Sequence, residues 1–299
     1  MAHSFATIAL TGNSADVRVA ECMLSLARHL AARAVKILVE TSVDLPFPAD
    51  TVRRCAEESF ATEAGLLIAI GGDGTLLHAT RLVAGYDVPL LGVNRGRLGF
   101  LTDIGARSML DDVDTVLDGH YSEDPRAMLS ARLERADGEV LTSVALNDVV
   151  LQKRETGRML DFETVINGNL VNSHGSDGLV VATATGSTAY ALSCGGPIVE
   201  PDLDVWVLAP ICPHTLSDRP VIVSGRSRIT LRLIERPSAR ALVSCDGESL
   251  GDMDLNDRLD VEKAAVKITL LHPPGYDYYR VLRSKLHWGG GGFEIRATD

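Results

Sequence analysis

The chain has 299 residues, of which 45% are hydrophobic and 23% charged, and its formal net charge is −11. This length suits two domains with a core each, and the composition is that of a globular protein rather than a disordered one. The negative charge argues against a nucleic-acid partner, because neutralising phosphates supplies most of that affinity. Aromatic residues, at 5%, are also too few for base-stacking platforms.

The N-terminus and the cysteines indicate a cytoplasmic protein with no membrane partner. The apolar run ATIAL near the N-terminus is too short for a secretory signal, and no run of about 18 apolar residues follows. The 5 cysteines are scattered and include no C-x-x-C pair. They predict neither a zinc knuckle nor a disulfide framework, which fits a reducing compartment.

The first third of the chain alternates short apolar runs with helical patterns. Strands are expected at 6–10, 35–40, 66–70 and 88–94, and helices at 14–33, 50–61, 75–85 and 108–117. The strands are continuously apolar, which is typical of a parallel sheet covered on both faces. Ser14 is the expected N-cap of the first helix. The pattern predicts an α/β domain with a parallel, Rossmann-like sheet over residues 1–120.

From residue 121 the pattern changes to strands joined by turn dipeptides. Asp137-Gly138 and Asn167-Gly168 each separate two extended runs, as in β-hairpins. Further strands are expected at 205–210, 227–234, 239–245 and 265–272. We expect a β-rich, mostly antiparallel domain over residues 121–275. A segment over 276–299 should pack back on the first domain and end in a loose glycine-rich tail.

An acid stands among glycines at the end of the apolar run LLIAI: Gly71-Gly72-Asp73-Gly74. Glycine permits positive φ and close approach to a ligand, and amides at the end of a parallel strand form an anion site. Because a helix is expected from Thr75 and helix N-termini bind anions, phosphate is the expected ligand. Asp73 can then hold Mg²⁺ through water or accept a proton from an attacking hydroxyl. The alternative is a tight turn with an Asx hydrogen bond.

Two further polar stretches are candidate nucleotide sites. In ATATGSTAYALSCGG a strand leads into a glycine-hydroxyl turn and a short helical segment, 189–194, suited to a diphosphate or ribose. Asn147-Asp148 precedes an apolar run, and an amide beside a carboxylate can hold an adenine edge and ribose hydroxyls. Taken alone, the first is equally consistent with a capped structural helix, and the second with an Asx turn.

Together these residues resemble the NAD kinases of the bacterial type. The resemblance covers nearly the whole chain, from GGDGTLLHATR through GVNRGRLGFLTD, NDVVL and SDGLVVATATGSTAYALSCGGPIVEP to PHTLSDRP. G-G-D-G-T alone is shared with diacylglycerol and sphingosine kinases, whereas its combination with N-D and T-G-S-T-A-Y is highly specific. The resemblance implies a diacylglycerol kinase/NAD kinase-like fold. It also implies transfer of the γ-phosphoryl group of ATP, with a divalent metal cation such as Mg²⁺, to the 2′-hydroxyl of the adenosine ribose of NAD⁺, giving NADP⁺.

The resemblance further implies roles for individual residues, with Asp73 as the proton acceptor. The residues implied to contact ATP, NAD⁺ or phosphate are Gly71, Gly72, Gly74, Thr75, His78, Asn147, Asp148, Arg158, Gly175, Asp177, Thr188, Ala189, Tyr190, Ala191, Leu192, Ser193 and Glu248. No residue is implied as a metal ligand. A homodimer or homotetramer is also implied, with Arg158 reaching phosphate or a neighbouring subunit's ligand.

One position departs from part of the family. Gly175, in NSHGSDG, stands where members that look strict for NAD⁺ carry arginine. Its small size leaves room and less positive charge, so we expect a relaxed acceptor choice that includes NADH.

Two other functions share the G-G-D-G-T turn. A lipid or sphingoid-base kinase needs an apolar acceptor pocket, whereas the N-D and T-G-S-T-A-Y stretches are polar. A non-catalytic nucleotide sensor has no use for an acid among phosphate amides. Both comparisons favour a dinucleotide kinase.

Overall fold

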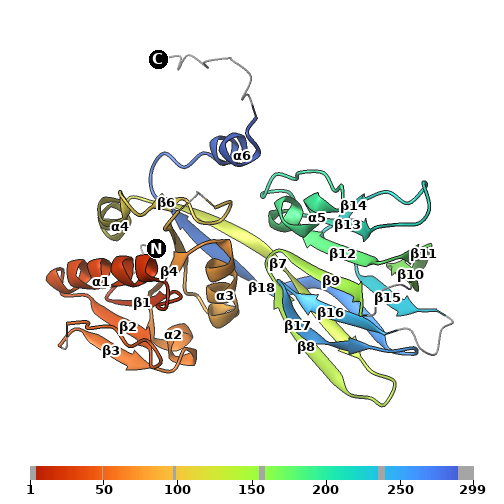
Figure 1. The fold of residues 1–299 in the computed structure, drawn as a ribbon, viewed down its shortest axis with the longest axis horizontal. Coiled ribbons are helices and arrows are strands. Elements are labelled where there is room, and N and C mark those ends of the chain that lie inside the picture. Colours follow the sequence, from red (N-terminus) through yellow and green to blue (C-terminus); the bar gives the residue numbers. More distant parts are fainter. Residues whose placement is uncertain (1–4, 49, 97–98, 155–158, 235–239, 289–299) are drawn as a thin grey trace. The chain divides into compact units, whose positions relative to one another are not determined.

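The computed structural model describes residues 5–48, 50–96, 99–154, 159–234 and 240–288 (Figure 1). The chain divides into two compact units: unit 1 runs to Pro125 and resumes at Thr269, and unit 2 is Arg126–Ile268. The expected domain limits, 1–120, 121–275 and 276–299, stay a prediction. Within the described ranges, no helix is long and apolar enough to cross a membrane.

Unit 1 is built on a parallel sheet. Its strands are β1 (Thr7–Thr11), β2 (Lys36–Glu40), β3 (Val52–Cys55), β4 (Leu66–Gly71), β5 (Leu90–Asn94) and β6 (Ile104–Gly105). Its helices are α1 (Val17–Ala32), α2 (Glu58–Glu63), α3 (Asp73–Val83), α4 (Met109–Leu117) and α6 (Tyr278–Leu286). The strand order is β5-β4-β1-β2-β3, with β6 and the end of β18 (Arg258–His272) beside β5. Every one of these pairings is parallel.

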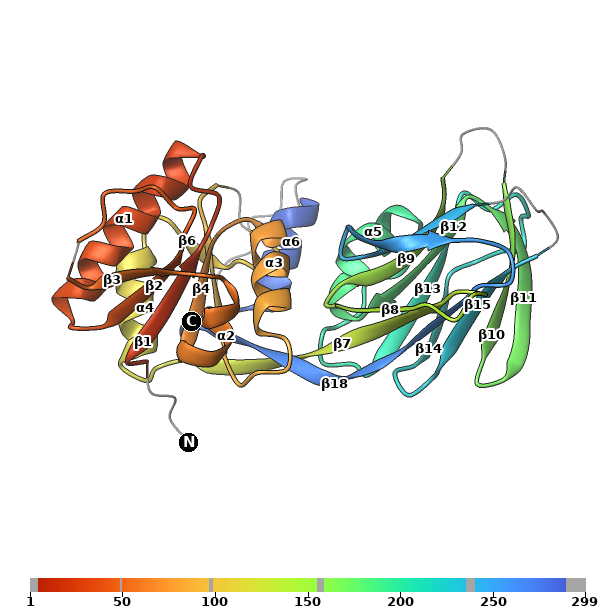
Figure 2. The same ribbon diagram turned by 90° about the horizontal axis from the view of Figure 1, so that it is seen from below.

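The sheet of unit 1 is covered by helices on both faces. One core joins α1 and α4 to the strands, through residues that include Ile8, Leu10, Met23, Leu26, Ile68, Val93 and Val113. Helices α2 and α3 lie against each other and bury Phe60, Leu76 and Ala79 (Figure 2). All residues of β4 and β5 are buried, as expected for central strands of such a sheet. The predicted α/β domain with a parallel sheet is confirmed.

Three local predictions in unit 1 are wrong. Asp16, not Ser14, caps α1: its carboxylate accepts the Arg18 amide at 3.0 Å and pairs with Arg95. The helix expected over 50–61 begins only at Glu58, because residues 52–55 form the edge strand β3 beside β2. Helix α3 begins at Asp73 rather than Thr75.

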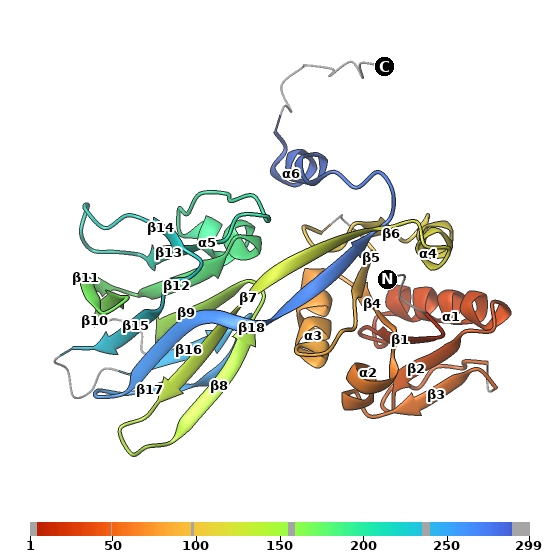
Figure 3. The same cartoon turned by 180° about the vertical axis from the view of Figure 1, so that it is seen from behind.

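Unit 2 consists almost entirely of antiparallel strands. They are β7 (Ser122–Glu134, which begins in unit 1), β8 (Val140–Ala145), β9 (Asp148–Lys153), β10 (Leu160–Ile166), β11 (Asn169–Ser176), β12 (Gly178–Thr183), β13 (Val205–Ile211), β14 (Val221–Ser224), β15 (Ile229–Leu233), β16 (Ala241–Cys245), β17 (Glu248–Met253) and most of β18. One sheet has the order β11-β10-β15-β18, with β7 joining β18 to β8. The other has the order β14-β13-β12-β9-β16-β17 (Figure 3).

The inner faces of these two sheets enclose the core of unit 2. It contains Leu133, Val149, Leu151, Phe162, Val181, Trp206, Leu231, Val243 and Val261 among others. The outer face of β9, β12 and β13 packs against a 3₁₀ turn, η1 (Thr185–Thr188), and the single-turn helix α5 (Tyr190–Ser193). The predicted hairpin at Asn167-Gly168 is present, with φ of 51° and 84° as a two-residue hairpin turn requires. The predicted β-rich, mostly antiparallel domain is confirmed.

Candidate active site

The G-G-D-G turn joins the buried strand β4 to α3. Gly72 is the N-cap, with φ −112° and ψ −170°, and Asp73 is the first helical residue. None of Gly71, Gly72 and Gly74 has a positive φ, so this part of the expectation is wrong. A Cβ at Gly71 would lie 2.2 Å from Thr75 Oγ1, whereas Gly72 and Gly74 face open space. The glycines therefore serve close packing and access to the helix N-terminus, where an anion is favoured.

The carboxylate of Asp73 is held by a loop that follows β5. Oδ2 accepts the amide of Phe100 and Oδ1 that of Leu101, each at 3.0 Å, and Thr102 Oγ1 lies 3.4 Å from Oδ1. Asn94 orders this loop by donating to Thr102 Oγ1 at 2.9 Å. A carboxylate has about four acceptor positions, so Asp73 can accept further hydrogen bonds while the loop holds it.

Gly99 belongs to the same arrangement and was not among the predicted site residues. A Cβ there would lie 2.1 Å from Asp73 Oδ1 and 2.3 Å from Thr102 Oγ1. Only glycine at this position lets the loop amides reach the carboxylate. In the sequence, Gly99 is the second glycine of GRLGF, and no local pattern indicates that it contacts Asp73.

With Asp73 as the expected proton acceptor, we predict that Gly99→Ala lowers kcat by about tenfold or more, because a displacement near 1 Å of a reacting group can cost up to about a hundredfold. The matched control is Gly105→Ala, where the nearest neighbour of a Cβ is Ser108 Oγ at 3.9 Å. Steady-state kinetics of both variants measure the effect. An unchanged kcat in a folded Gly99→Ala protein would contradict this account of the loop.

His78 lies one turn further along α3 and has a partner of its own. Its Nε2 is 3.0 and 3.1 Å from the two carboxylate oxygens of Glu57, the residue before α2. Its side chain is 43% exposed. Thr75, in the first turn, is half-buried.

In unit 2, Asp246 holds the segment that carries Asn147 and Asp148. Its Oδ2 accepts the Leu146 amide at 2.7 Å, and its Oδ1 accepts the amides of Asn147 at 2.7 Å and Asp148 at 3.1 Å. The Asp246 amide donates to the Asp148 carbonyl at 3.0 Å. Asp246 was missing from the predicted site residues, which included its neighbour Glu248 instead.

Thr183 holds the same segment from the other side. Its Oγ1 donates to the Leu146 carbonyl at 2.6 Å, and its amide donates to the Asn147 carbonyl at 2.9 Å. Gly186 packs on this segment so closely that a Cβ would lie 2.1 Å from the Asn147 oxygen. The N-D and T-G-S stretches, far apart in the sequence, therefore form one rigid unit.

Asp148 is a buried acid, only 6% exposed. Within the described part of the chain, its carboxylate makes no hydrogen bond or ion pair. Burial, and then the nearby negative charge of Asp246, raise the pKa of Asp148 to about 7. A strongly perturbed carboxyl without a protein partner is typical of a functional site, because a ligand can complete its hydrogen bonds.

The T-G-S-T-A-Y stretch forms η1 and α5 beside this acid. Arg126 Nη1 donates to Thr185 Oγ1 at 3.0 Å, and Ser187 Oγ donates to the Ala184 carbonyl at 2.7 Å. Burial raises the pKa of Tyr190, and the neighbouring Cys194 and Asp148 add to this shift. The predicted segment Thr188–Ser193 thus includes Tyr190, which lies close enough to Asp148 to feel its charge.

The remaining predicted residues lie at several places in unit 2. Asp177, between β11 and β12, pairs with Lys153 at 2.6 Å. Gly175 is in β11 opposite Asp161 of β10. Glu248 begins β17 and is exposed. Arg158 lies outside the described residues.

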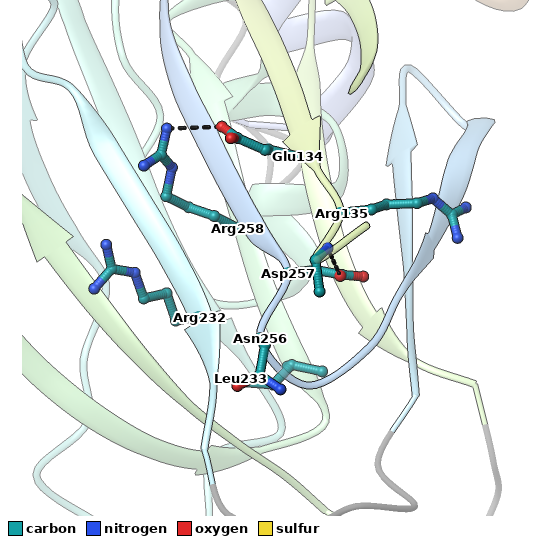
Figure 4. Close-up of a pocket in the computed structure, with 8 residues that line it drawn as sticks. Glu134, Arg135, Arg232, Leu233, Asn256, Asp257 and Arg258 are labelled. Carbon is teal, nitrogen blue, oxygen red and sulfur yellow. Dashed lines mark hydrogen bonds and ion pairs between the residues drawn. The ribbon is translucent and has the colours of Figure 1, made fainter. Parts of the chain in front are cut away.

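A polar pocket of about 470 Å³ in unit 2 is lined by none of these predicted residues. It is lined by Glu134, Arg135, Ala136, Arg232, Leu233, Asn256, Asp257 and Arg258 (Figure 4). Its charges largely serve the protein itself: Arg258 pairs with Glu134 at 3.0 Å, and Asp257 accepts the Ala136 amide at 2.8 Å. We therefore do not assign this pocket to the candidate site, whose residues in unit 2 are Asp148 and its surroundings.

Comparisons with known proteins show the family of this chain. The family profile of the ATP-NAD kinase N-terminal domain matches residues 8–121, and that of the C-terminal domain matches 146–272. The NAD kinase of Nitrosococcus oceani is 41% identical over 97% of this chain and 99% of its own length. That of Thiobacillus denitrificans is 43% identical over 95% of this chain and 98% of its own.

Two solved structures are also similar. Yeast NADH kinase complexed with NADH has a TM-score of 0.88 at 26% identity, covering 98% of this chain and 90% of that one. An NAD kinase from Archaeoglobus fulgidus in complex with ATP has a TM-score of 0.67 at 24% identity, covering 94% and 98%.

The family profiles and relatives that match this α/β unit and the β-rich unit after it identify a nucleotide-dependent phosphotransferase. The chain belongs to the ATP-NAD kinase family. It is an enzyme that phosphorylates NAD with ATP as the donor.

Proposed function

We propose that Asp73 accepts the proton of the adenosine 2′-hydroxyl of NAD⁺ as the γ-phosphoryl group of ATP is transferred to it. The observation that carries this role is the carboxylate of Asp73 at the start of α3, held by two loop amides with acceptor positions left. A carboxylate cannot ionise a sugar hydroxyl beforehand, since its ordinary pKa is near 4. It orients the hydroxyl and takes the proton late, which suffices for a loose transition state.

Asn147, Asp148 and the Thr188–Ser193 segment are proposed to bind the dinucleotide. Asp148 offers buried acceptor atoms for ribose hydroxyls or an adenine amino group, and Asn147 both donates and accepts. Gly71, Gly72, Gly74 and Thr75 are proposed to hold phosphate through the N-terminus of α3. For His78, Arg158, Asp177 and Glu248 the proposed contacts rest on the family resemblance.

A divalent cation, Mg²⁺ in the first place, is proposed to act with ATP. Within the described ranges, no group of three or more His, Cys, Asp or Glu side chains could hold a metal ion. Mg²⁺ needs no such group, because it is usually bound by one or two carboxylates, substrate phosphates and water. Asp73 is the carboxylate that would hold it beside the phosphates. When bound, the cation would neutralise charge on the transferred group.

The proposal is tested by incubating the purified protein with Mg²⁺, ATP and NAD⁺ and measuring NADP⁺ with an NADP-specific dehydrogenase. We expect NADP⁺ only when all three components are present. Omitting Mg²⁺ with a chelator should remove the activity and leave NAD⁺ binding measurable by calorimetry. NAD⁺ binding without any NADP⁺ formation would instead favour a nucleotide sensor.

NADH is proposed as a second acceptor. At Gly175 a Cβ fits without strain, because it would meet Asp161 Oδ1 at 3.6 Å and Met159 Sδ at 3.9 Å, which are ordinary contact distances. The similar yeast enzyme was crystallised with NADH. A homodimer or homotetramer and a cytoplasmic location stay predictions from the sequence.

We expect Gly175→Arg to lower kcat/KM for NADH relative to NAD⁺ by about tenfold, a difference of about 1.4 kcal/mol. An arginine would fill the space at this position, and its guanidinium could pair with Asp161 across β10 and β11. Gly175→Ala is the control, because it adds one carbon and keeps most of the room. Equal NADH to NAD⁺ ratios in the arginine variant and the unsubstituted enzyme would contradict the role of this position.

A further inference from the structure

Asp246 occupies a turn whose sequence explains its presence without any function. Asp246-Gly247 joins β16 to β17, with φ of 48° and 81°. Asp-Gly and Asn-Gly are the preferred pairs for such two-residue hairpins. Its side chain also accepts amides from a segment 98 to 100 residues earlier in the chain. The hairpin does not need those contacts.

We propose that Asp246 is a positioning residue of the dinucleotide site, whose carboxylate fixes the backbone of Leu146–Asp148 and thereby aims the Asn147 and Asp148 side chains at the bound NAD⁺. This inference rests on the proposed function of Asn147 and Asp148. Its basis is the set of three amide hydrogen bonds at 2.7, 2.7 and 3.1 Å that Asp246 accepts.

The hydrogen bonds of Asp246 and Thr183, called here the clamp, hold the whole backbone of Leu146–Asp148. The Asp246 carboxylate accepts hydrogen bonds from the three amides. Thr183 donates to the carbonyls of Leu146 and Asn147, and the Asp246 amide donates to that of Asp148. Every backbone N–H and C=O of Leu146–Asp148 is therefore bonded. Charge-assisted bonds to a carboxylate are stronger than neutral ones, so Asp246 is the strongest part of this clamp.

Asp246 also sets the electrostatics around Asp148. Asp246 from the β16–β17 turn is the charged group that shifts this acid. Tyr190 of α5 and Cys194 after it are titratable neighbours whose own pKa values Asp148 helps to raise. The negative charge of Asp246 opposes ionisation of Asp148 and contributes to its raised pKa. Dinucleotide binding through the ionised carboxylate should thus strengthen as pH rises through about 7.

The test uses Asp246→Asn in the full-length enzyme. Asparagine suits the hairpin turn, as Asn167 does at φ 51° in the β10–β11 hairpin, so the fold should persist. The variant loses the charge and one of the two acceptor oxygens. We expect the dissociation constant for NAD⁺, measured by calorimetry, to rise about tenfold at pH 8, since one strong hydrogen bond is worth about that factor. The KM for ATP should not change.

The pH profile separates positioning from a merely structural role. With the charge removed, the midpoint of NAD⁺ binding against pH should move below that of the unsubstituted enzyme. Asp137→Asn is the matched control, because Asp137-Gly138 forms another hairpin turn of unit 2 and Asp137 is exposed. It should leave both affinity and midpoint unchanged.

Asp246→Glu provides a second arm, because it keeps the charge and moves the carboxylate. It should weaken NAD⁺ binding without lowering the midpoint. The proposal is overturned if NAD⁺ affinity is unchanged in both Asp246 variants, or if the midpoint stays in place in a folded Asp246→Asn protein. Because binding is the readout, an unsubstituted enzyme that binds NAD⁺ but makes no NADP⁺ would refute the proposed function and leave this test intact.

Discussion

Asp73→Asn is expected to lower kcat for NADP⁺ formation by about a thousandfold, because general acid–base catalysis contributes about 10²- to 10⁴-fold. Asparagine has nearly the same shape as aspartate but can neither take up a proton nor carry negative charge toward a metal ion. NAD⁺ should still bind, since Asn147, Asp148 and the Thr188–Ser193 segment are unchanged. The measurement is kcat by the coupled assay, with NAD⁺ affinity by calorimetry in parallel.

The structure also predicts a limited effect of this variant on stability. Asp73 accepts the amides of Phe100 and Leu101 with different oxygens, and asparagine retains one of these acceptors. A single hydrogen bond contributes about 1 kcal/mol net, so the protein should remain folded. Asp87→Asn, an exposed acid after α3, is the control and should keep full activity. If Asp73→Asn turned over at a near-normal rate, both the proton-acceptor and the metal-binding roles would be refuted.

Much of the site could be predicted because its signals are local. A run of apolar residues followed by glycines and an acid places Asp73 after a buried strand, and the structure has this order in β4 and α3. Asp148 likewise opens β9 directly after Asn147, and Thr188 closes η1. Such motifs occupy a few consecutive residues, so a single sequence contains them whole.

The errors arose where tertiary contacts override a local pattern. Residues 52–55 carry two arginines that suit a helix, yet Arg54 Nε donates to the Val43 carbonyl at 3.1 Å and the segment pairs with β2. At the start of α1, Asp16 competes with Ser14 and succeeds because it also pairs with Arg95. Neither contact is visible from propensity.

The residues that sequence reasoning missed act across long separations. Gly99 lies against the Asp73 carboxylate, and Asp246 and Thr183 form hydrogen bonds with the Leu146–Asp148 backbone. A D-G pair in an otherwise extended stretch indicates a hairpin, and it does form one. Its second role depends on which strand lies beside β16, and that strand is β9.

His272 is expected to contribute strongly to the stability of unit 1. It is 2% exposed at the end of β18, with Nδ1 2.9 Å from Asp103 and Nε2 3.1 Å from Asp124. The Tyr276 ring stacks on it at 3.7 Å. Both ring nitrogens can donate only when the imidazole is protonated. We expect His272→Gln to lower the free energy of unfolding of unit 1 by about 3 kcal/mol, because the variant removes the cation that faces two largely buried acids, Asp103 and Asp124.

The control for His272 is a similar pair at the surface of the same unit. His29 lies 2.8 Å from Asp114, with both side chains about 30% exposed, so His29→Gln should cost less than about 1 kcal/mol. Amide hydrogen exchange of the strands of unit 1 measures both variants. Equal losses for the two substitutions would contradict the importance of burial at His272.

The pH dependence gives a second, independent test of His272. Burial alone would lower the pKa of His272, but the hydrogen bonds to Asp103 and Asp124 outweigh it and raise the pKa above 6.5. Because the folded state binds this proton more tightly than the unfolded state, the stabilisation is fully present below about pH 6.5 and is lost as pH rises through the raised value. Unit 1 should therefore become less stable above that pH in the unsubstituted enzyme, and this loss should be absent in His272→Gln. A pH profile that is the same in both proteins would show that His272 is not held as a cation between its two acids.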